Sequence, residues 1–412
     1  MSQQEISGNA TKHYQYYPKG DFPPYLAYGF RLIFLLLAPY IVISIVLWGL
    51  AFAGYITLPM SDTLSWHIFE FLYGVGIAGV MAFLLTALPE LFPGIVPIVG
   101  RKLALIVGLW LLGRIGFWFI DYLGVYLVAL LNLVHFIWVI AYSIKPVLLD
   151  PLQRHASIGY TLVALFMIEV WFFGAVAGFW EFVLLDILKV ALGGFMFLTI
   201  LVLRRVNMEA MNEIIEDEQI DDVFVAKPPR YNLAAFSVLL FTAVEFFFPQ
   251  NQVLGWLGLA AMSAILGILS DYVLEHESIL LKPYTLYMMS ILILMAQGYG
   301  FMGLCYLIPE LYGVNHFRHF LTSGAFGLAF YMVMIIISQV HTGRSLKNNF
   351  LITLSVVLII VATFMRAFIP FFPEYMSVIY LGSSIIWAIA FVLYMVQFFG
   401  YLVRPRADGI KG

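Results

Sequence analysis

Residues 31–55 read RLIFLLLAPYIVISIVLWGLAFAGY, and this stretch indicates a membrane-spanning helix. Apart from Arg31 it holds no charged residue, and it is long enough to cross a bilayer as one helix, which takes about 20 apolar residues. The whole chain repeats this character, since 63% of its 412 residues are hydrophobic and 11% are charged. A soluble domain carries about 25% charged residues, so lipid must be the solvent for most of the surface.

Eleven further apolar runs follow the first, each bounded by polar residues. The sequence therefore predicts an all-α, polytopic membrane bundle of about twelve transmembrane helices. The spans are expected at about 31–55, 66–89, 102–120, 122–144, 157–180, 182–203, 231–249, 252–271, 284–308, 319–340, 350–370 and 374–402.

The basic residues predict how the bundle is oriented. All but four of the 21 Lys and Arg residues fall in segments that lie on one side if twelve spans alternate. An excess of Lys and Arg marks the cytoplasmic side, so both termini are expected in the cytoplasm. The other four basic residues are Arg114, Lys189, Arg318 and Arg366.

The longest polar stretch, 204–230, divides the chain into two sets of six spans. It holds seven acidic residues between Glu209 and Asp222, and a solvated linker is the simplest reading. The expected organisation is a cytoplasmic segment 1–30, helices one to six in 31–203, the acidic cytoplasmic linker 204–230, helices seven to twelve in 231–402, and a cytoplasmic tail 403–412. A net charge of −3 gives no support to a nucleic-acid partner, and none is expected.

Two pairs of ionisable residues share one spacing. His67 opens the second predicted span and Arg114 follows 47 positions later, while His319 opens the tenth span and Arg366 also follows 47 positions later. Ionisable groups inside a membrane are costly and by default mark function. Each could instead snorkel to the headgroups, and the two histidines could be interfacial residues that face water.

A haem site accounts for both pairs. Two neutral imidazoles on facing helices can supply both axial ligands of a haem iron. Two arginines at one depth can pair with the haem propionates, because guanidinium forks match carboxylates. His67 and His319 are therefore the predicted iron ligands, and Arg114 and Arg366 the predicted propionate partners.

Four further residues belong to the predicted site. Glu70 lies one turn after His67 and could orient its imidazole, and Arg318 neighbours His319. His316 and His135 are the alternative iron ligands, although His135, in the middle of a span, also fits a buried, hydrogen-bonded histidine.

Several short motifs occur in a familiar order along the chain. They are Trp66-His67-Ile68-Phe69-Glu70, Phe83-Leu84-Leu85-Thr86-Ala87-Leu88-Pro89, Trp110-Leu111-Leu112-Gly113-Arg114, His319 with Gly324-Ala325, His341-Thr342-Gly343-Arg344, and Arg366. From about residue 28 to 370 the chain thereby resembles the NnrS family, bacterial inner-membrane proteins that contain haem and copper and are linked to nitric oxide stress and denitrification. The resemblance implies a protein with haem, of b type, that binds, detoxifies or responds to nitric oxide.

The chain departs from the family pattern at three places. Phe69 stands where the family has a second histidine, Ser338 where it has an arginine, and Leu203-Arg204-Arg205 where a glycine–glycine–arginine run is expected. The missing histidine makes copper doubtful, and we expect little or no stoichiometric copper, because copper favours imidazole ligands. His341-Thr342-Gly343-Arg344 itself reads as the C-terminal turn of a helix with a basic cap.

A second resemblance selects the same two histidines. His316-Phe317-Arg318-His319-Phe320, followed by Ser323-Gly324-Ala325-Phe326, is similar to the span-ten motif of the haem–copper oxidase catalytic subunit. That subunit has twelve spans, with low-spin haem ligands at the outer ends of spans two and ten. His67 and His319 fall at these places, as an analogy at the level of the fold.

Three functions remain open from the sequence. The first is a haem protein that binds or consumes nitric oxide or relays electrons, with a quinol or respiratory partner. The second is a twelve-span secondary transporter, in which Glu169, His135 and Gln297 would line a path near the middle of the membrane. The third is a membrane subunit of a respiratory complex. Bound haem would separate the first function from the second.

Overall fold

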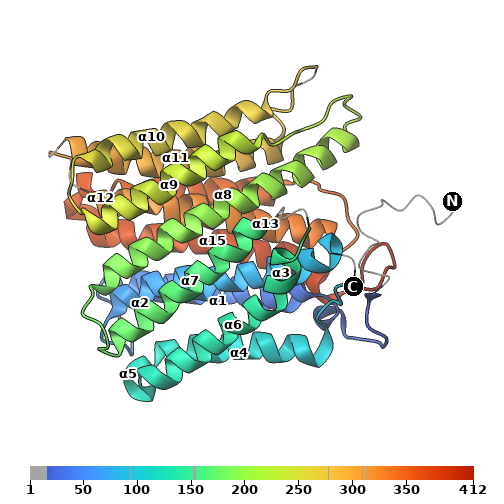
Figure 1. Ribbon diagram of the computed structural model, residues 1–412, viewed down its shortest axis with the longest axis horizontal. Coiled ribbons are helices and arrows are strands. Elements are labelled where there is room, and N and C mark those ends of the chain that lie inside the picture. The colour runs from blue at the N-terminus through green and yellow to red at the C-terminus, as the bar shows by residue number, and fades with distance from the viewer. Residues whose placement is uncertain (1–15, 93, 152–154, 277, 309, 312) are drawn as a thin grey trace.

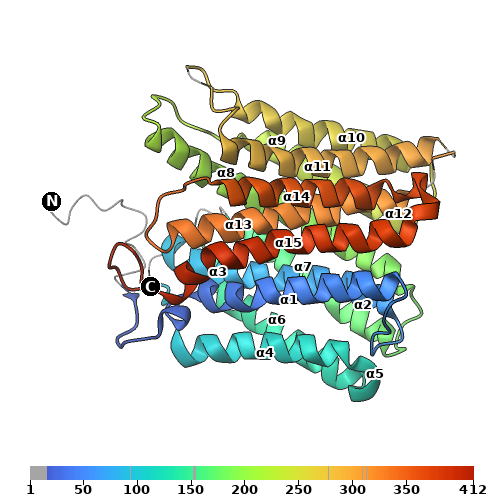
Figure 2. The same ribbon diagram turned by 180° about the vertical axis from the view of Figure 1, so that it is seen from behind.

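In the computed structural model, the described residues are 16–412 without 93, 152–154, 277, 309 and 312. They form helices and no strand. Long helices run side by side to make one bundle, as Figures 1 and 2 show from opposite sides. The predicted all-α membrane bundle is therefore confirmed. Residues 1–15 of the predicted N-terminal segment lie outside the described residues.

Ten crossings of the bundle are made by one principal helix each. These are α1 (Gly29–Phe52), α4 (Gly100–Trp118), α6 (Val125–Leu148), α7 (Ala156–Val176), α8 (Leu184–Asp217), α9 (Pro228–Phe247), α10 (Val253–Gly267, extended by η4, Ile268–Tyr272), α11 (Pro283–Leu307), α14 (Phe350–Ala367) and α15 (Met376–Val403). Four short helices cap the ends of crossings: η2 (Pro24–Leu26), α5 (Ile120–Leu123), η7 (Ile369–Phe371) and η8 (Pro373–Tyr375).

Two crossings are composite, and each changes its helical type part of the way along. The first consists of α2 (Thr63–Phe69), η3 (Glu70–Val75) and α3 (Gly76–Leu91). The second consists of α12 (Val314–Phe317), η5 (Arg318–Phe320), η6 (Leu321–Phe326) and α13 (Gly327–Val340). Both η3 and η6 are π-helices.

Among the described residues, eleven crossings are long and apolar enough to span a membrane. The remaining one, α4, carries Arg101, Lys102 and Arg114 within 19 residues. The start of α1 nevertheless meets the end of α15, because Nη1 of Arg31 donates to the carbonyl oxygen of Arg404 at 2.9 Å. A chain whose first crossing begins where its last one ends crosses an even number of times. α4 must therefore cross as well, and it brings the total to twelve.

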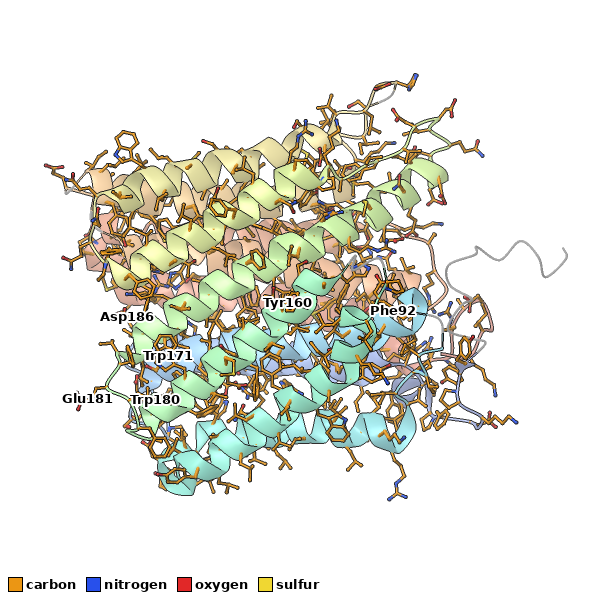
Figure 3. All side chains as sticks on the ribbon, viewed as in Figure 1. Phe92, Tyr160, Trp171, Trp180, Glu181 and Asp186 are labelled. Carbon is orange, nitrogen blue, oxygen red and sulfur yellow. The ribbon has the colours of Figure 1, made fainter. Side chains whose placement is uncertain are left out.

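The two ends of the bundle differ in chemistry. We call the end where α1 begins and α15 ends the basic end, and the other end the aromatic end. Trp171, Trp180 and Glu181 lie together toward the aromatic end, far from Phe92 at the basic end (Figure 3). Trp180 follows the end of α7 and is 45% exposed. Exposed tryptophan near a helix end is typical of the membrane–water interface.

The acidic linker is more helical than its polarity predicts. α8 continues to Asp217 and α9 begins at Pro228, so residues 218–227 connect them. The helix persists because it still buries apolar side chains there, such as Met211. The connection is also held in place, since Lys282 pairs with Glu218 at 2.8 Å.

The four residues 341–344 form the C-terminal turn predicted for α13. α13 ends at Val340, and Gly343 has a φ of +74°, the left-handed conformation common in such turns. Nη1 of Arg344 donates to the carbonyl oxygen of Thr342 at 3.1 Å. The tail joins the turn, because the amide of Ala407 also donates to Thr342 at 3.0 Å.

Candidate functional site

His67 lies near the aromatic end, in the helix that opens the second crossing. The side chain of Asp62 accepts from the amide of Ser65 at 2.9 Å and so starts α2. One turn later, the imidazole of His67 stacks on Trp48 of α1, with ring centroids 4.2 Å apart and planes 3° apart. Its Nδ1 is buried and has no hydrogen-bond partner. The ring is thus held by stacking, with no hydrogen bond to Nδ1.

His319 lies at the corresponding place in the second composite crossing, and its proton can be assigned. Its Nδ1 is 3.1 Å from the carbonyl oxygen of Asn315 and 3.1 Å from that of His316. Carbonyl oxygens only accept, so Nδ1 must carry the hydrogen. Nε2 then has the free lone pair. A backbone carbonyl that holds one ring nitrogen is the usual support of a metal-ligating histidine.

Both histidines line one cavity of about 380 Å³ near the aromatic end. Its volume falls within the range of about 300–1,000 Å³ that is typical of cofactor and ligand sites. Residues from both composite crossings and from α1, α8, α14 and α15 form its walls. The polar and aromatic lining includes Trp48, His67, Lys189, Asn315, His316, Arg318, His319, Arg366, Tyr380 and Trp387.

The two crossings share a local geometry beside the cavity. The π-helix η3 begins three residues after His67, and η6 begins two residues after His319. A π-helical turn inside a longer helix is rare and frequently marks a functional site. The repeat seen in the sequence therefore extends to the backbone, although nothing in the sequence argument predicted the π-helices.

Arg366 differs from the other cations of the cavity. Arg318 is paired with Glu245 through both of its terminal nitrogens, and Lys189 is paired with Asp186 at 2.8 Å. Arg366 instead donates to Nδ1 of His316 at 3.0 Å and lies over the ring of Tyr380 at 4.1 Å. Within the described part of the chain it has no carboxylate partner. A partly buried guanidinium without an acid favours an anionic group on a ligand.

Glu70 and Arg114 form a second, separate polar cluster. They pair at 2.9 Å, with both side chains almost fully buried. Tyr40 donates to Glu70, Arg114 also donates to Asn132, and Gly74 leaves the room, because a Cβ there would lie 2.5 Å from both side chains. Arg114 does not line the cavity. In the structure Glu70 therefore holds Arg114 and makes no hydrogen bond to His67, contrary to the roles expected for both residues.

Two further positions point away from the cavity. His135 is buried, and its Nε2 lies 3.4 Å from the sulfur of Met81. Phe69 is fully buried among aromatic rings and stacks on Phe172 at 4.7 Å. His135 thus fits the reading of a buried histidine. Position 69, where the resemblance leads us to expect a second histidine, lies on a different face of the helix from His67.

The structure adds residues that the sequence argument did not assign to the site. Lys189 is one of the basic residues outside the expected cytoplasmic segments, and nothing in the sequence singles out Trp48, Tyr380 or Trp387. All four line the cavity from α8, α1 and α15. Their sequence positions give no signal of this, because long-range packing brings the helices together. Glu169, His135 and Gln297, expected to line a transport path, line neither of the two cavities described in this bundle.

Comparison with known proteins gives one match. The chain matches the family model described as NnrS protein over residues 24–406, which is nearly its whole length. No curated protein and no solved structure matches the chain.

Proposed function

Because the chain belongs to the NnrS family, we propose that it is a haem protein of the membrane that acts on nitric oxide. The haem would lie in the cavity between His67 and His319. The observation that carries the proposal is that these two histidines, from crossings far apart in the sequence, line one cavity.

The residues of the cavity fit a haem in three respects. His319 keeps Nε2 free while its Nδ1 is held by carbonyl oxygens. Aromatic side chains such as Trp48 and Trp387 give flat apolar walls for a macrocycle. Arg366 supplies a cation without an acid, which suits a propionate. Of the two expected propionate partners, Arg366 lines the cavity and Arg114 does not, so Arg366 is the proposed partner, with Lys189 as a second cation at the same cavity.

The chain's own groups define what the site can do. His67 and His319 would bind the iron, and Arg366 and the aromatic walls would orient the macrocycle and exclude water. The haem would supply an iron that binds nitric oxide and exchanges one electron. Because His67 has no hydrogen bond to Nδ1, it is the less constrained of the two imidazoles and the one expected to yield to an added ligand.

The location of the cavity also fits this use. It lies near the aromatic end, and the basic residues predict that this end faces away from the cytoplasm. Nitric oxide that arrives from outside the cell would therefore meet the site within the outer leaflet. We also propose that the protein lies in the bacterial inner membrane, as the family resemblance implies.

The decisive experiment is the visible spectrum of the purified protein in detergent, before and after dithionite and then with nitric oxide. We expect a low-spin haem spectrum that changes when nitric oxide is added. Protein that is folded and colourless after expression with haem supplied would reject the proposal. If haem is bound but its spectrum does not change with nitric oxide, the haem proposal stands and the nitric oxide function is rejected.

A further inference from the structure

A second, smaller cavity lies next to the cavity that His67 and His319 line, which we call the histidine cavity. The smaller cavity is nearer the basic end. Its volume is about 70 Å³. It is formed by α3, α8 and α13, with contributions from α1, α7 and η6. Its lining consists of Phe34, Gly79, Val80, Phe83, Leu84, Ile158, Phe195, Leu198, Thr199, Val202, Leu203, Phe326, Ala329, Phe330, Val333 and Met334.

The lining of this apolar pocket offers almost nothing to water. Thr199 has the one side-chain hydroxyl among the lining residues, and its Oγ1 already donates to the carbonyl oxygen of Phe195 at 2.8 Å. A buried water needs about two to four polar partners, and apolar cavities without them stay dry and accept apolar guests such as xenon. The pocket is therefore suited to a small, uncharged, apolar molecule.

Two aromatic rings separate the apolar pocket from the histidine cavity. Phe326 and Phe330 line both, and their ring centroids are 4.5 Å apart. Phe326 is the last residue of the π-helix η6. Gly79 makes room for this wall, because a Cβ there would lie 1.9 Å from the ring of Phe330. Rotation of these rings would connect the two spaces.

The other side of the pocket reaches the surface of the bundle. Val80, Ile158, Val202 and Val333 line it and are partly exposed. They lie within membrane-spanning helices, where an exposed side chain faces lipid. The pocket therefore lies between the hydrocarbon of the membrane, in which apolar gases dissolve well, and the wall of the histidine cavity.

We propose that this pocket binds small apolar gas molecules, nitric oxide among them, and passes them from the lipid toward the histidine cavity. Binding of the gas depends only on the size and polarity of the pocket. The passage of nitric oxide to an iron rests on the proposed function.

Xenon tests the binding site, since it is apolar and visible by anomalous diffraction. Crystals of the purified protein pressurised with xenon are expected to show a xenon atom in the pocket. Val333→Phe, which places a ring in the pocket, should abolish xenon binding there, and so should Ala329→Leu from the buried side. Val357→Phe, at a lipid-facing position of α14, should leave xenon binding unchanged. Absence of xenon from the wild-type pocket, or its persistence in both filled variants, overturns the proposal.

Rebinding kinetics test the passage. Carbon monoxide or nitric oxide is released by a laser flash from the reduced, haem-loaded protein, and its return is timed. Val333→Phe should slow the return and Val357→Phe should not. Unchanged rates in a variant that has lost its xenon would reject the passage. Failure of the protein to hold haem would appear as absent absorbance, whereas the xenon result does not depend on haem, so the two failures are distinguishable.

Discussion

Nη1 of Arg366 donates to Nδ1 of His316 across 3.0 Å. Because a guanidinium nitrogen cannot accept, Nδ1 of His316 must be the acceptor, and its hydrogen must lie on Nε2. Neither nitrogen then has a free lone pair for a metal. His319, three residues later, has the opposite tautomer, with Nδ1 protonated and Nε2 free. Two neighbouring histidines thus line one cavity in different roles: His319 can bind a metal, and His316 orients Arg366.

The first prediction separates these roles. His67→Ala and His319→Ala should each remove most of the haem absorbance while the protein remains inserted in the membrane. His316→Ala and His135→Ala should keep it, because His316 offers no free lone pair to the cavity and His135 does not line it. The measurement is the haem-to-protein ratio of each purified variant. Full haem in either of the first two variants would contradict the assignment of ligands, and its loss in His316→Ala alone would make His316 the ligand.

Arg366 should affect how tightly the haem is held. Arg366→Ala removes one charged hydrogen bond, which costs about 1.5–3 kcal/mol. That loss corresponds to roughly a tenfold to hundredfold faster transfer of haem to an acceptor protein, at about 1.4 kcal/mol per factor of ten. Lys189→Ala should have a smaller effect, since Lys189 already pairs with Asp186 and is a third exposed. Equal rates in the two variants would count against Arg366 as the propionate partner.

The fold was predictable because membrane spans are local in sequence. Every crossing is a predominantly apolar run between polar residues, and the lipid requires each run to be helical. Lys and Arg in the connecting segments then indicate the orientation of the crossings. Even α4, with its three basic residues, was found in this way. The end of α8 was not predicted, because beyond residue 203 packing against neighbouring loops, rather than lipid, maintains the helix.

The site was predictable only in part, for a geometric reason. His67 and His319 could be found because each opens an apolar run at the same depth. The direction of a side chain is harder to infer: Glu70 lies three positions after His67, which is about 60° short of a full turn of helix. That angle is enough to direct it to Arg114 and Tyr40. Lys189 and Trp48 come from other helices, and no local pattern indicates their approach.

The Glu70–Arg114 pair should support the fold and leave the haem in place. Arg114→Ala leaves the carboxylate of Glu70 buried without its partner, and breaking a buried pair costs about 3–5 kcal/mol. The thermal unfolding midpoint in detergent should fall, while the haem-to-protein ratio of the folded fraction stays near wild type. Replacing both residues by leucine should restore much of the stability. If Arg114→Ala loses haem while its thermal unfolding midpoint is unchanged, Arg114 contacts the haem after all.

Orientation is a separate prediction, and reporter fusions test it. Fusions after residues 60, 180 and 312 should report the outside, and fusions after 95, 150, 215 and 345 the inside. The reason is that the basic end carries nearly all loop Lys and Arg residues. A cytoplasmic signal after residue 60 together with one after 312 would show that the bundle has the opposite orientation. The histidine cavity would then lie in the inner leaflet.

The turn that ends α13 should depend on Gly343. At a φ of +74° a side chain is strained, and here an added Cβ would lie 2.5 Å from Cγ of Asp408 in the tail. Asp408 cannot simply withdraw, because Arg406 holds it through two hydrogen bonds and itself donates to the carbonyl oxygen of His341 at 3.0 Å. Gly343→Ala should therefore lower stability by about 1–3 kcal/mol, the usual cost of such backbone strain.

A matched control for this change is Gly400→Ala in α15. No atom lies near the position of its Cβ, and the residue is helical, so alanine there should be neutral or stabilising by up to about 1 kcal/mol. Thermal unfolding of the two variants in the same detergent compares them directly. If Gly343→Ala unfolds at the wild-type temperature, the tail does not pack on the turn as the structure shows. If it unfolds earlier, protease should cleave the released tail of that variant faster than the tail of the control.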